Sequence, residues 1–370
     1  MKAFQCTCGQ PLFFHNTACL GCGSAIAYDP TSRLLGALVA REDGTWTLAA
    51  DERDPKPAFR FCEHRVDAAA CNWLIPTESA HAACLSCRLT RTIPDLSDPR
   101  NVVRLELIET AKRRVLFGLQ TCGLPIVPTD EDQQGGMVFE LLEERPGAER
   151  VMTGHADGLI TINVAEADAD YREKNRESFH EPYRTVIGHL RHEIGHYYWD
   201  RLIRDTDWLP RFREVFGDEQ ADYVQALKVY YDNGPPLDWP DRFISGYAAS
   251  HPWEDWAECW AHYLHLRATL QTVESFSLDT SKTPFRITPF EDDVLYDRNA
   301  PSALAFLSWI NAWVKLTTVL NETARSMGQP DVYPFVMNRA VVTKLHFVQC
   351  VVETRGKGGI VPPTERLATA

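Results

Sequence analysis

The stretch His192-Glu193-Ile194-Gly195-His196 decides how the rest of this 370-residue chain is interpreted. Residues four apart share one face of an α-helix, so His192 and His196 would point the same way with the Glu193 carboxylate beside them. Two imidazoles and a carboxylate within reach of a metal-bound water are the minimal equipment of a zinc hydrolase. This hypothesis requires that the stretch is helical and that a third ligand lies nearby.

The residues on both sides of this stretch favour a helix from Glu181 to Ile203. Pro182 suits the first turn of a helix, where its missing N–H would have no partner. Apolar residues recur at helical spacing and would form a buried stripe, with His192 and His196 on the adjoining face. The stripe consists of Val186, Ile187, Leu190, Ile194, Tyr197, Tyr198 and Leu202.

A third metal ligand is needed because a catalytic zinc usually has three protein ligands and one open position. The best candidates are Glu254 and Glu258, four residues apart on a helix predicted from Pro252 to Leu270. One could bind the metal while the other orients a ligand. A pair of solvent-exposed acids is the ordinary alternative, but large apolar neighbours indicate that this helix is buried, and buried carboxylates need partners. These neighbours are Trp253, Trp256, Trp260, Tyr263 and Leu264.

Eight of the 11 cysteines precede residue 90 and form two sets of four. The alternative is scattered free thiols, but clustered cysteines in a reducing compartment more often bind metal. Cys6, Cys8, Cys19 and Cys22 are predicted to hold one structural zinc, although Cys6 and Cys8 form C-x-C where zinc ribbons usually have C-x-x-C. Glycines after Cys8 and Cys22 would let backbone N–H groups point at sulfur. Cys62, Cys71, Cys84 and Cys87 are predicted to hold a second zinc, and His64 could replace one of them.

Length and composition limit the possible functions. The chain is 44% hydrophobic and can bury a full core, while its net charge of -13 disfavours nonspecific binding of nucleic acid by the whole molecule. The first residues lack the apolar core of a secretory signal, and no later run approaches the roughly 18 apolar residues that cross a bilayer. We therefore expect a cytoplasmic protein without membrane attachment.

The pattern of turns and periodicity divides the chain into three parts. Residues 1–95 are expected to form a zinc-ribbon region with short strands, residues 96–355 a second domain, and residues 356–370 a flexible tail. Predicted strands cover residues 34–39, 45–48, 137–142 and 158–164, and an acidic loop covers 166–170. Predicted helices cover residues 98–119, 181–203, 218–231, 252–270, 301–327 and 335–352.

Three segments together carry a resemblance to a known family. They are Arg191–Trp199, Ala221–Leu227 and His251–Glu258. With the cysteine-rich start, they resemble a bacterial family of zinc-binding metallopeptidases whose members carry an N-terminal zinc-ribbon region. More generally, the chain is similar to the gluzincins, which pair H-E-x-x-H with a downstream glutamate. In gluzincins of the anthrax lethal factor type, the first Glu of an E-x-x-A-E pattern binds the metal and a tyrosine seven residues earlier faces it.

This resemblance implies roles for residues of this chain. Glu254 would complete the metal ligands, Glu258 would support it from outside the metal's first sphere, and Tyr247 would be the facing hydroxyl; a packed side chain is the ordinary alternative for Tyr247. His251, His262 and His265 could assist at the same place. The strand at 158–164 would offer its edge to an extended substrate, the ordinary alternative being an interior strand.

The resemblance also implies a fold and a function. The fold would be α+β: a small β-rich zinc-ribbon region followed by a mainly helical zincin-like domain with a small sheet. The protein would be a metallopeptidase that cleaves peptide bonds with a zinc-activated water and Glu193 as general base. It would carry one catalytic zinc and two structural ones, act on a protein or peptide, and contact a protein partner through the zinc-ribbon region.

The alternative function is a noncatalytic module, in which zinc ribbons bind protein or nucleic acid and the zincin-like part is only a scaffold. Nucleic acid is disfavoured because the N-terminal region is nearly charge-balanced. The nearest basic cluster is Lys112-Arg113-Arg114, on a predicted helix where solvent exposure would explain it equally well.

Overall fold

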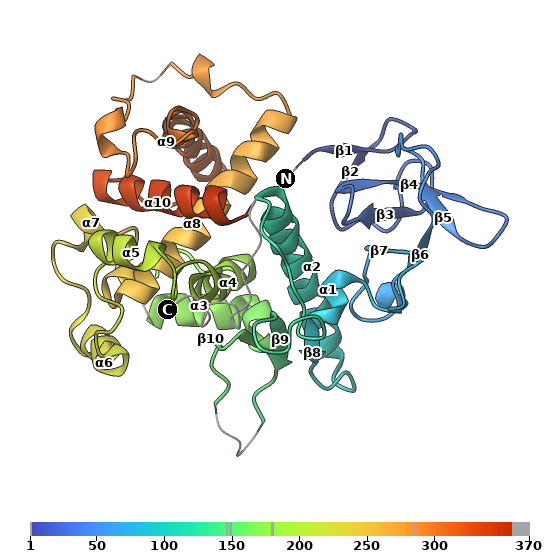
Figure 1. Cartoon of the computed structure of the whole chain (residues 1–370), viewed down its shortest axis with the longest axis horizontal. Coiled ribbons are helices and arrows are strands. Elements are labelled where there is room, and N and C mark those ends of the chain that lie inside the picture. The colour runs from blue at the N-terminus through green and yellow to red at the C-terminus, as the bar shows by residue number, and fades with distance from the viewer. Residues whose placement is uncertain (1, 146, 148–149, 179–180, 285, 357–370) are drawn as a thin grey trace. The chain divides into compact units, whose positions relative to one another are not determined.

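The computed structural model describes residues 2–145, 147, 150–178, 181–284 and 286–356 (Figure 1). The chain divides into two compact units: residues 1–120 with 126–172, and residues 121–125 with 173–370. The sequence predicted a domain boundary near residue 95. The borders of the two units fall later in the chain, and the predicted boundary stays a prediction. The predicted flexible tail lies, from residue 357 onward, outside the described residues.

The first unit begins with the cysteine-rich region, which is built from antiparallel strands. A two-stranded sheet pairs β1 (Phe4–Gln5) with β2 (Pro11–Leu12). A five-stranded sheet in the order β3-β4-β5-β6-β7 follows, and the predicted strands at 34–39 and 45–48 are confirmed as β4 and β5. Its strands are β3 (Ile26–Asp29), β4 (Leu34–Ala40), β5 (Trp46–Leu48), β6 (Phe59–Phe61) and β7 (Leu74–Pro76). Its small core contains Ala27, Leu38, Leu48, Phe59 and Leu74.

The rest of the first unit is a long helix and a second sheet. The helix α2 (Pro99–Thr121) confirms the prediction for residues 98–119, and α1 (Leu85–Arg88) and η1 (Glu63–Arg65) precede it. The sheet has the order β10-β11-β9-β8, with β9 parallel to both of its neighbours. Its strands are β8 (Thr90–Thr92), β9 (Val138–Leu142), β10 (Gly154–Ala156) and β11 (Leu159–Asn163).

The prediction that residues 158–164 offer a free edge is wrong. β11 pairs with β9 over its whole length and with β10 through Leu159, Ile160 and Thr161, so it is an interior strand. The sequence did not reveal β10 because a three-residue strand, Gly154-His155-Ala156, has no alternation of apolar and polar residues. The edges of this sheet are β10 and β8.

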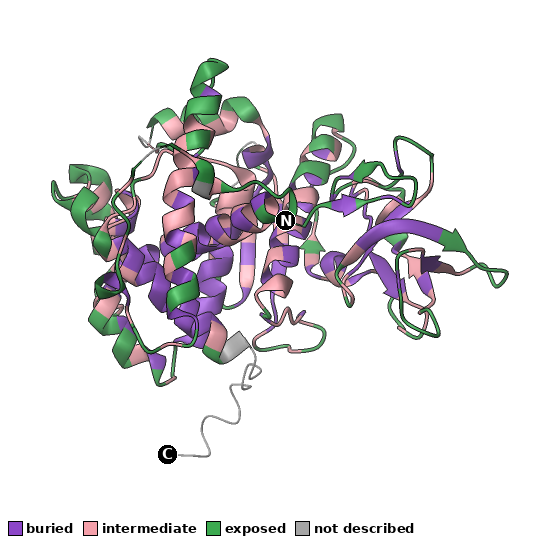
Figure 2. Cartoon of the chain, turned by 90° about the horizontal axis from the view of Figure 1, so that it is seen from above, coloured by how far each residue is buried: buried purple, intermediate pink, exposed green. Residues whose placement is uncertain are grey.

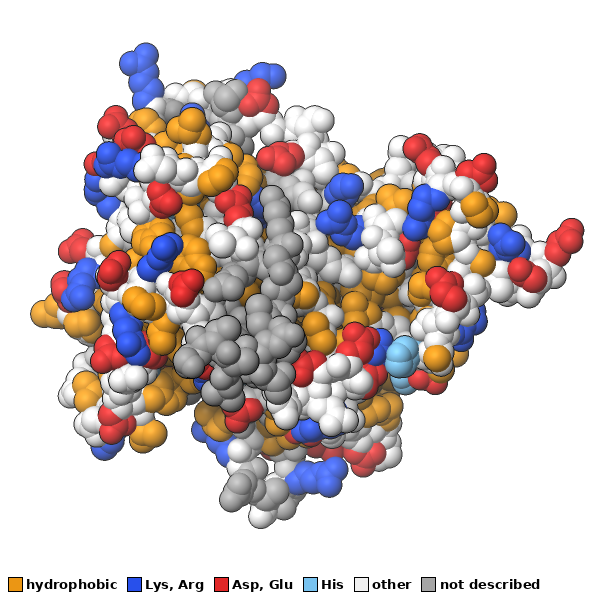
Figure 3. Space-filling view, viewed as in Figure 1, with side chains coloured by type: hydrophobic (Ala, Val, Ile, Leu, Met, Phe, Trp, Pro, Cys, Tyr) orange, Lys and Arg blue, Asp and Glu red, His pale blue; other side chains and the backbone are white. Residues whose placement is uncertain are grey.

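The basic cluster on α2 is not a solvent-exposed patch. Lys112 and Arg113 are buried; Nζ of Lys112 lies 2.7 Å from Oε1 of Glu109, and Arg113 donates to the backbone oxygen of Ala69 at 3.0 Å. These charges therefore hold the first unit together. On the face drawn in Figure 3, acidic and basic side chains are interspersed.

The second unit is helical, and its centre is the contact between α4 (Val186–Leu202) and α8 (Pro252–Ser275). Gly195 permits this contact, because a Cβ at that position would lie 3.1 Å from Cα of Ala257 and 3.2 Å from the side chain of Trp260. Nε1 of Trp256 donates to the backbone oxygen of Gly195 at 2.9 Å. Trp256, Trp260, Tyr263 and Leu264, which the sequence predicted to bury this helix, are buried, while Trp253 is half-buried. Figure 2 shows that buried residues gather in the interior of the helical part.

η2 (Val164–Ala167) belongs to the first unit, and α3 (Ala169–Ser178) begins in the first unit and ends in the second. The other elements of the second unit are α5 (Trp208–Phe216), α6 (Tyr223–Asn233), α7 (Trp239–Arg242), η3 (Tyr247–Ala249), η4 (Thr280–Lys282), η5 (Asp292–Val294), α9 (Ala303–Ser326) and α10 (Arg339–Gly356). The expected acidic loop at 166–170 is instead η2 and the start of α3. Together the two units give the α+β composition that the sequence predicted.

Several helices begin later than predicted: α9 by two residues, α10 by four, and α4 and α6 by five. α4 begins at Val186, because the Thr185 side chain accepts a hydrogen bond from the N–H of Gly188 at 3.0 Å and caps the helix there. Pro182 therefore lies outside α4. α6 begins at Tyr223, where the Asp222 carboxylate accepts from the N–H of Gln225 at 3.0 Å.

α9 does not fit the expectation that no later segment is apolar enough to cross a bilayer. By length and composition alone this helix would suffice, although the core helices of soluble proteins meet the same criterion. Residues at helical spacing on one side of α9 are buried, including Phe306, Ile310 and Trp313.

Candidate metal centre

Three predicted ligands converge where α4 packs on α8. His192 and His196 lie one turn apart on α4, and Glu254 lies in the first turn of α8. Nε2 of His192 is 2.9 Å from Oε2 of Glu254, and Nε2 of His196 is 3.5 Å from its Oε1. One ligand atom from each of the three side chains lies within 4.8 Å of the other two. Two imidazole nitrogens and one carboxylate oxygen at this spacing fit a single zinc ion.

The electrostatics of the three side chains also fit a cation. Glu254 is only 1% exposed, and a buried carboxylate is costly unless a positive charge accompanies it. Burial alone would raise the pKa of Glu254, but the imidazoles of His196 and His192 outweigh burial and hold this pKa well below its ordinary value. Because imidazoles that lower this pKa are protonated, a divalent cation that binds here would take the place of their protons at the two nitrogens.

A second layer of hydrogen bonds fixes His192. Its Nδ1 lies 2.9 Å from Oε1 of Glu258, one turn beyond Glu254 on α8. The other oxygen of Glu258 accepts from the Ser245 hydroxyl at 2.7 Å, and Oγ of Ser245 accepts from the N–H of Ala248 at 3.0 Å. A carboxylate behind a histidine ligand orients the ring and leaves the opposite nitrogen for the metal.

Glu193 lies beside this donor set but outside its hydrogen bonds. Its side chain is buried, and burial raises its pKa, although the neighbouring His192 and His196 oppose the rise. Among the described residues, it forms no hydrogen bond or ion pair of its own. Its carboxylate is therefore available to a molecule that enters the centre.

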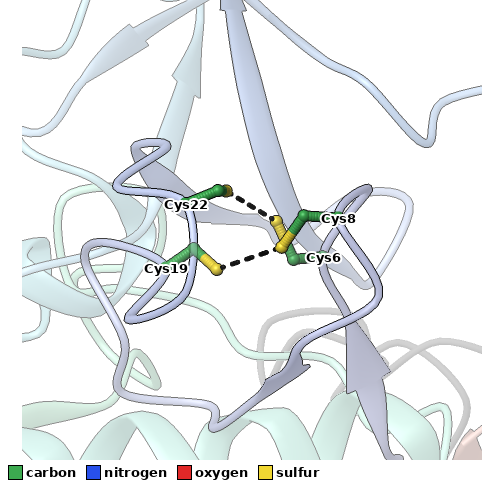
Figure 4. Close-up of side chains that lie close together, drawn as sticks. All are labelled: Cys6, Cys8, Cys19 and Cys22. Carbon is green, nitrogen blue, oxygen red and sulfur yellow. Dashed lines mark hydrogen bonds between the residues drawn. The ribbon is translucent and has the colours of Figure 1, made fainter.

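The first cysteine set meets at one point in the N-terminal unit (Figure 4). Sγ of Cys6 lies 3.7 Å from Sγ of Cys22, and Sγ of Cys8 lies 3.7 Å from Sγ of Cys19. The four sulfur atoms are within 4.8 Å of one another. The C-x-C spacing of Cys6 and Cys8 thus still brings both sulfurs to the cluster.

Backbone geometry around this set explains its glycines. Gly9 and Gly23 have φ angles of +90° and +75°, which other residues rarely adopt. Their own N–H groups donate to carbonyl oxygens, and the N–H one residue later is the one that points at sulfur. At Cys22, the hydroxyl and the N–H of Ser24 lower the pKa of the thiol to about 6. At Cys8 the N–H of Gln10 lowers the pKa, but hydrogen bonds with Cys22 and the other thiols raise it to about 12, so the surroundings favour the thiolate at Cys22 and not at Cys8.

The second cysteine set is fully buried. Sγ atoms of Cys71 and Cys84 are 3.5 Å apart, the N–H of Cys84 points at Sγ of Cys62 at 3.3 Å, and all four sulfur atoms, including that of Cys87, lie within 4.8 Å of one another. His64 is not part of the cluster. It is partly exposed, and its Nδ1 lies 2.5 Å from Oδ2 of Asp67.

Two parts of the chain match models of known protein families. Residues 101–351 match the model of a family described as "Putative zinc-binding metallo-peptidase". The chain belongs to this family. Residues 3–98 match the model of a zinc-ribbon domain, so this metallopeptidase homologue carries the N-terminal region that the cysteines predicted.

Three mycobacterial relatives, each named as an uncharacterized protein, match almost the whole chain. The chain is 41% identical over 355 residues to an uncharacterized protein of Mycobacterium bovis and to uncharacterized proteins of two Mycobacterium tuberculosis strains. Each match covers 95% of this chain and 96% of the relative. No solved structure matches the chain.

Two tyrosines lie near the metal centre of this metallopeptidase homologue, and the sequence indicated only one. Tyr247 is in η3, and its ring centroid is 6.0 Å from that of His192. Tyr223, at the start of α6, donates its hydroxyl hydrogen bond to Oε1 of Glu254 at 2.7 Å. A separation of 31 residues has no periodic meaning, so the sequence offered no signal for Tyr223.

The three histidines near α8 hold other parts of the fold. Nδ1 of His251 accepts from the N–H of Trp253 at 3.1 Å and caps α8. His262 pairs with the hydroxyl of Tyr333 at 2.7 Å, and His265 pairs with the guanidinium of Arg191 at 2.5 Å. Each of these three histidines therefore has a structural partner, and a part in the chemistry stays a prediction.

Proposed function

We propose that the chain is a zinc-dependent metallopeptidase of the gluzincin type. The observation that carries the proposal is the convergence of His192, His196 and Glu254 within 4.8 Å, although Glu254 follows His196 by 58 positions in the sequence. Membership of a zinc-binding metallopeptidase family supports the same function.

Each residue of the centre then has a chemical role. His192, His196 and Glu254 would hold the zinc, which supplies a Lewis acid and a nucleophilic water at neutral pH. Glu193 would accept a proton from the attacking water and pass it to the leaving amine, the work of a general base and acid. Tyr247 would donate a hydrogen bond to the oxygen that becomes negative during attack. Glu258 would hold the ring of His192 in place.

The two cysteine sets would bind two structural zinc ions. A site closed by four thiolates has no position for a water or substrate, so it contributes stability and not hydrolysis. We assign the N-terminal region a role in binding a protein partner, and we place the whole protein in the cytoplasm, where the thiols stay reduced.

The proposal is tested by hydrolysis of a complex peptide mixture, analysed by mass spectrometry. The wild-type chain should produce new peptide termini that a chelator abolishes. Glu193→Gln should retain zinc and lose at least about 100-fold in rate, because general base catalysis is worth that factor or more. The matched control is Glu214→Gln, which changes an exposed residue of α5 and should cleave like wild type. Undiminished cleavage by Glu193→Gln would refute its role as base.

A further inference from the structure

Tyr223 has a hydrogen bond that the proposed chemistry does not use. Its hydroxyl donates to Oε1 of Glu254 at 2.7 Å, while Oε2 of the same carboxylate lies 2.9 Å from Nε2 of His192. Oε2 of Glu254 thus faces His192, while Oε1 is shared by the Tyr223 hydroxyl and by Nε2 of His196, 3.5 Å away. A carboxylate with one oxygen occupied by a phenol presents the other oxygen to a cation.

The ring of Tyr223 is fixed by the start of α8. It packs edge-on against His251, with centroids 5.2 Å apart, and against Trp253 at 6.0 Å. Nε2 of His251 also donates to the backbone oxygen of Ala221 at 3.0 Å, two residues before Tyr223. The segment that carries the tyrosine is therefore tied to the same helical turn that carries Glu254.

The remainder of α6 contributes little to the core. None of its described residues is buried, and Val224, Val229 and Tyr231 are exposed. The best-anchored part of this helix is thus its first residue, whose side chain reaches a metal ligand. Packing of a hydrophobic core does not explain why the hydroxyl lies where it does.

We propose that Tyr223 is a positioning residue that sets the orientation of the Glu254 carboxylate and so strengthens metal binding at His192, His196 and Glu254. This inference rests on the proposed function, because it assumes that these three side chains bind zinc. It concerns zinc affinity and does not require that Tyr223 touches a substrate.

The test is a zinc titration of the full-length chain in buffers of fixed free zinc concentration, with bound zinc counted by elemental analysis. A double variant, His192→Ala with His196→Ala, gives the occupancy of the other sites as a baseline. Tyr223→Phe keeps the ring and removes only the hydroxyl. The affinity for the zinc ion that binds in addition to this baseline should fall by about 10- to 100-fold. That is the usual effect of losing a hydrogen-bond partner of a metal ligand.

The matched control is Tyr230→Phe on the same helix. The Tyr230 ring packs against Tyr247 with centroids 5.6 Å apart, but its hydroxyl forms no hydrogen bond within the described part of the chain. This variant should bind zinc like wild type. Equal affinities of Tyr223→Phe and wild type would overturn the inference.

A double-mutant cycle separates positioning from a general structural effect. If Tyr223 acts through Glu254, adding Tyr223→Phe to Glu254→Ala should change zinc affinity by no more than about twofold. The same loss in both backgrounds would overturn the inference, because the hydroxyl would then act without the carboxylate. A wild-type chain with no more zinc than the baseline variant would overturn the proposed function and this inference together.

Discussion

Gly195→Ala tests whether the spacing of α4 and α8 creates the metal centre. The added Cβ would lie 3.1 Å from Cα of Ala257 and 3.2 Å from the side chain of Trp260. Ordinary contact begins at 3.4 Å, so the helices must separate by at least about 0.3 Å at this point. Neither neighbour can easily yield, because one is backbone and the other is a buried indole.

The expected effects on stability and on zinc binding differ in size. Alanine favours a helix over glycine by about 1 kcal/mol, while overpacking costs about 1–3 kcal/mol, so the net loss of unfolding free energy should be about 0–2 kcal/mol. Zinc sites tolerate deviations of only about 0.2 Å in ligand distance. The increased distance between His196 and Glu254 should therefore lower the zinc affinity clearly, even if the free energy of unfolding falls only slightly.

Urea unfolding and zinc titration measure the two effects. The control is Gly118→Ala on α2, where a Cβ meets nothing within 4 Å and the helical preference of alanine should stabilise the chain. If Gly195→Ala were stabilised like Gly118→Ala and kept wild-type zinc affinity, the close approach at Gly195 would not matter to the centre.

Three further predictions concern other parts of the chain. Nζ of Lys344 lies 2.6 Å from the fully buried carboxylate of Asp255, so Lys344→Met leaves that carboxylate without its ion pair. The free energy of unfolding, measured by urea titration, should fall by about 3 kcal/mol or more. Arg339→Met breaks an exposed ion pair and should change this free energy little. His64→Ala should retain every zinc in elemental analysis, and loss of one ion would make His64 a ligand. Burial lowers the pKa of His262 from 6.5 to about 4, so between these pH values the unfolded chain binds the extra proton and stability rises with pH. Over that range the gain should be roughly 3 kcal/mol, and His262→Gln should abolish this part of the pH dependence.

The sequence predicted the features that depend on local spacing. A four-residue interval places His192 beside His196 on any helix, and short cysteine intervals bring pairs of thiols together in a turn. The aromatic residues around Glu254 indicated a buried helix because burial follows side-chain size and polarity. These patterns indicated His192, His196 and the pair Glu254 and Glu258, whereas the choice of Glu254 as the ligand and the zincin-like fold came from the family resemblance.

Features that depend on tertiary contacts did not appear in the sequence. β10 is too short to show a period, so nothing in the sequence opposed the edge role that the resemblance implied for β11. The charges of Lys112 and Arg113 looked solvent-exposed because their partners, Glu109 and Ala69, are recognisable only in the fold. Tyr223 reaches Glu254 from the start of α6, which His251 ties to the start of α8, and no sequence pattern shows that contact.

The central claim is that one zinc ion lies between α4 and α8. X-ray diffraction from crystals of the zinc-loaded chain, with data collected on both sides of the zinc absorption edge, tests it most directly. We predict an anomalous peak bonded to His192, His196 and Glu254, with a fourth position not occupied by protein. The absence of a peak there, or a fourth protein ligand that closes the site, would contradict a hydrolytic centre.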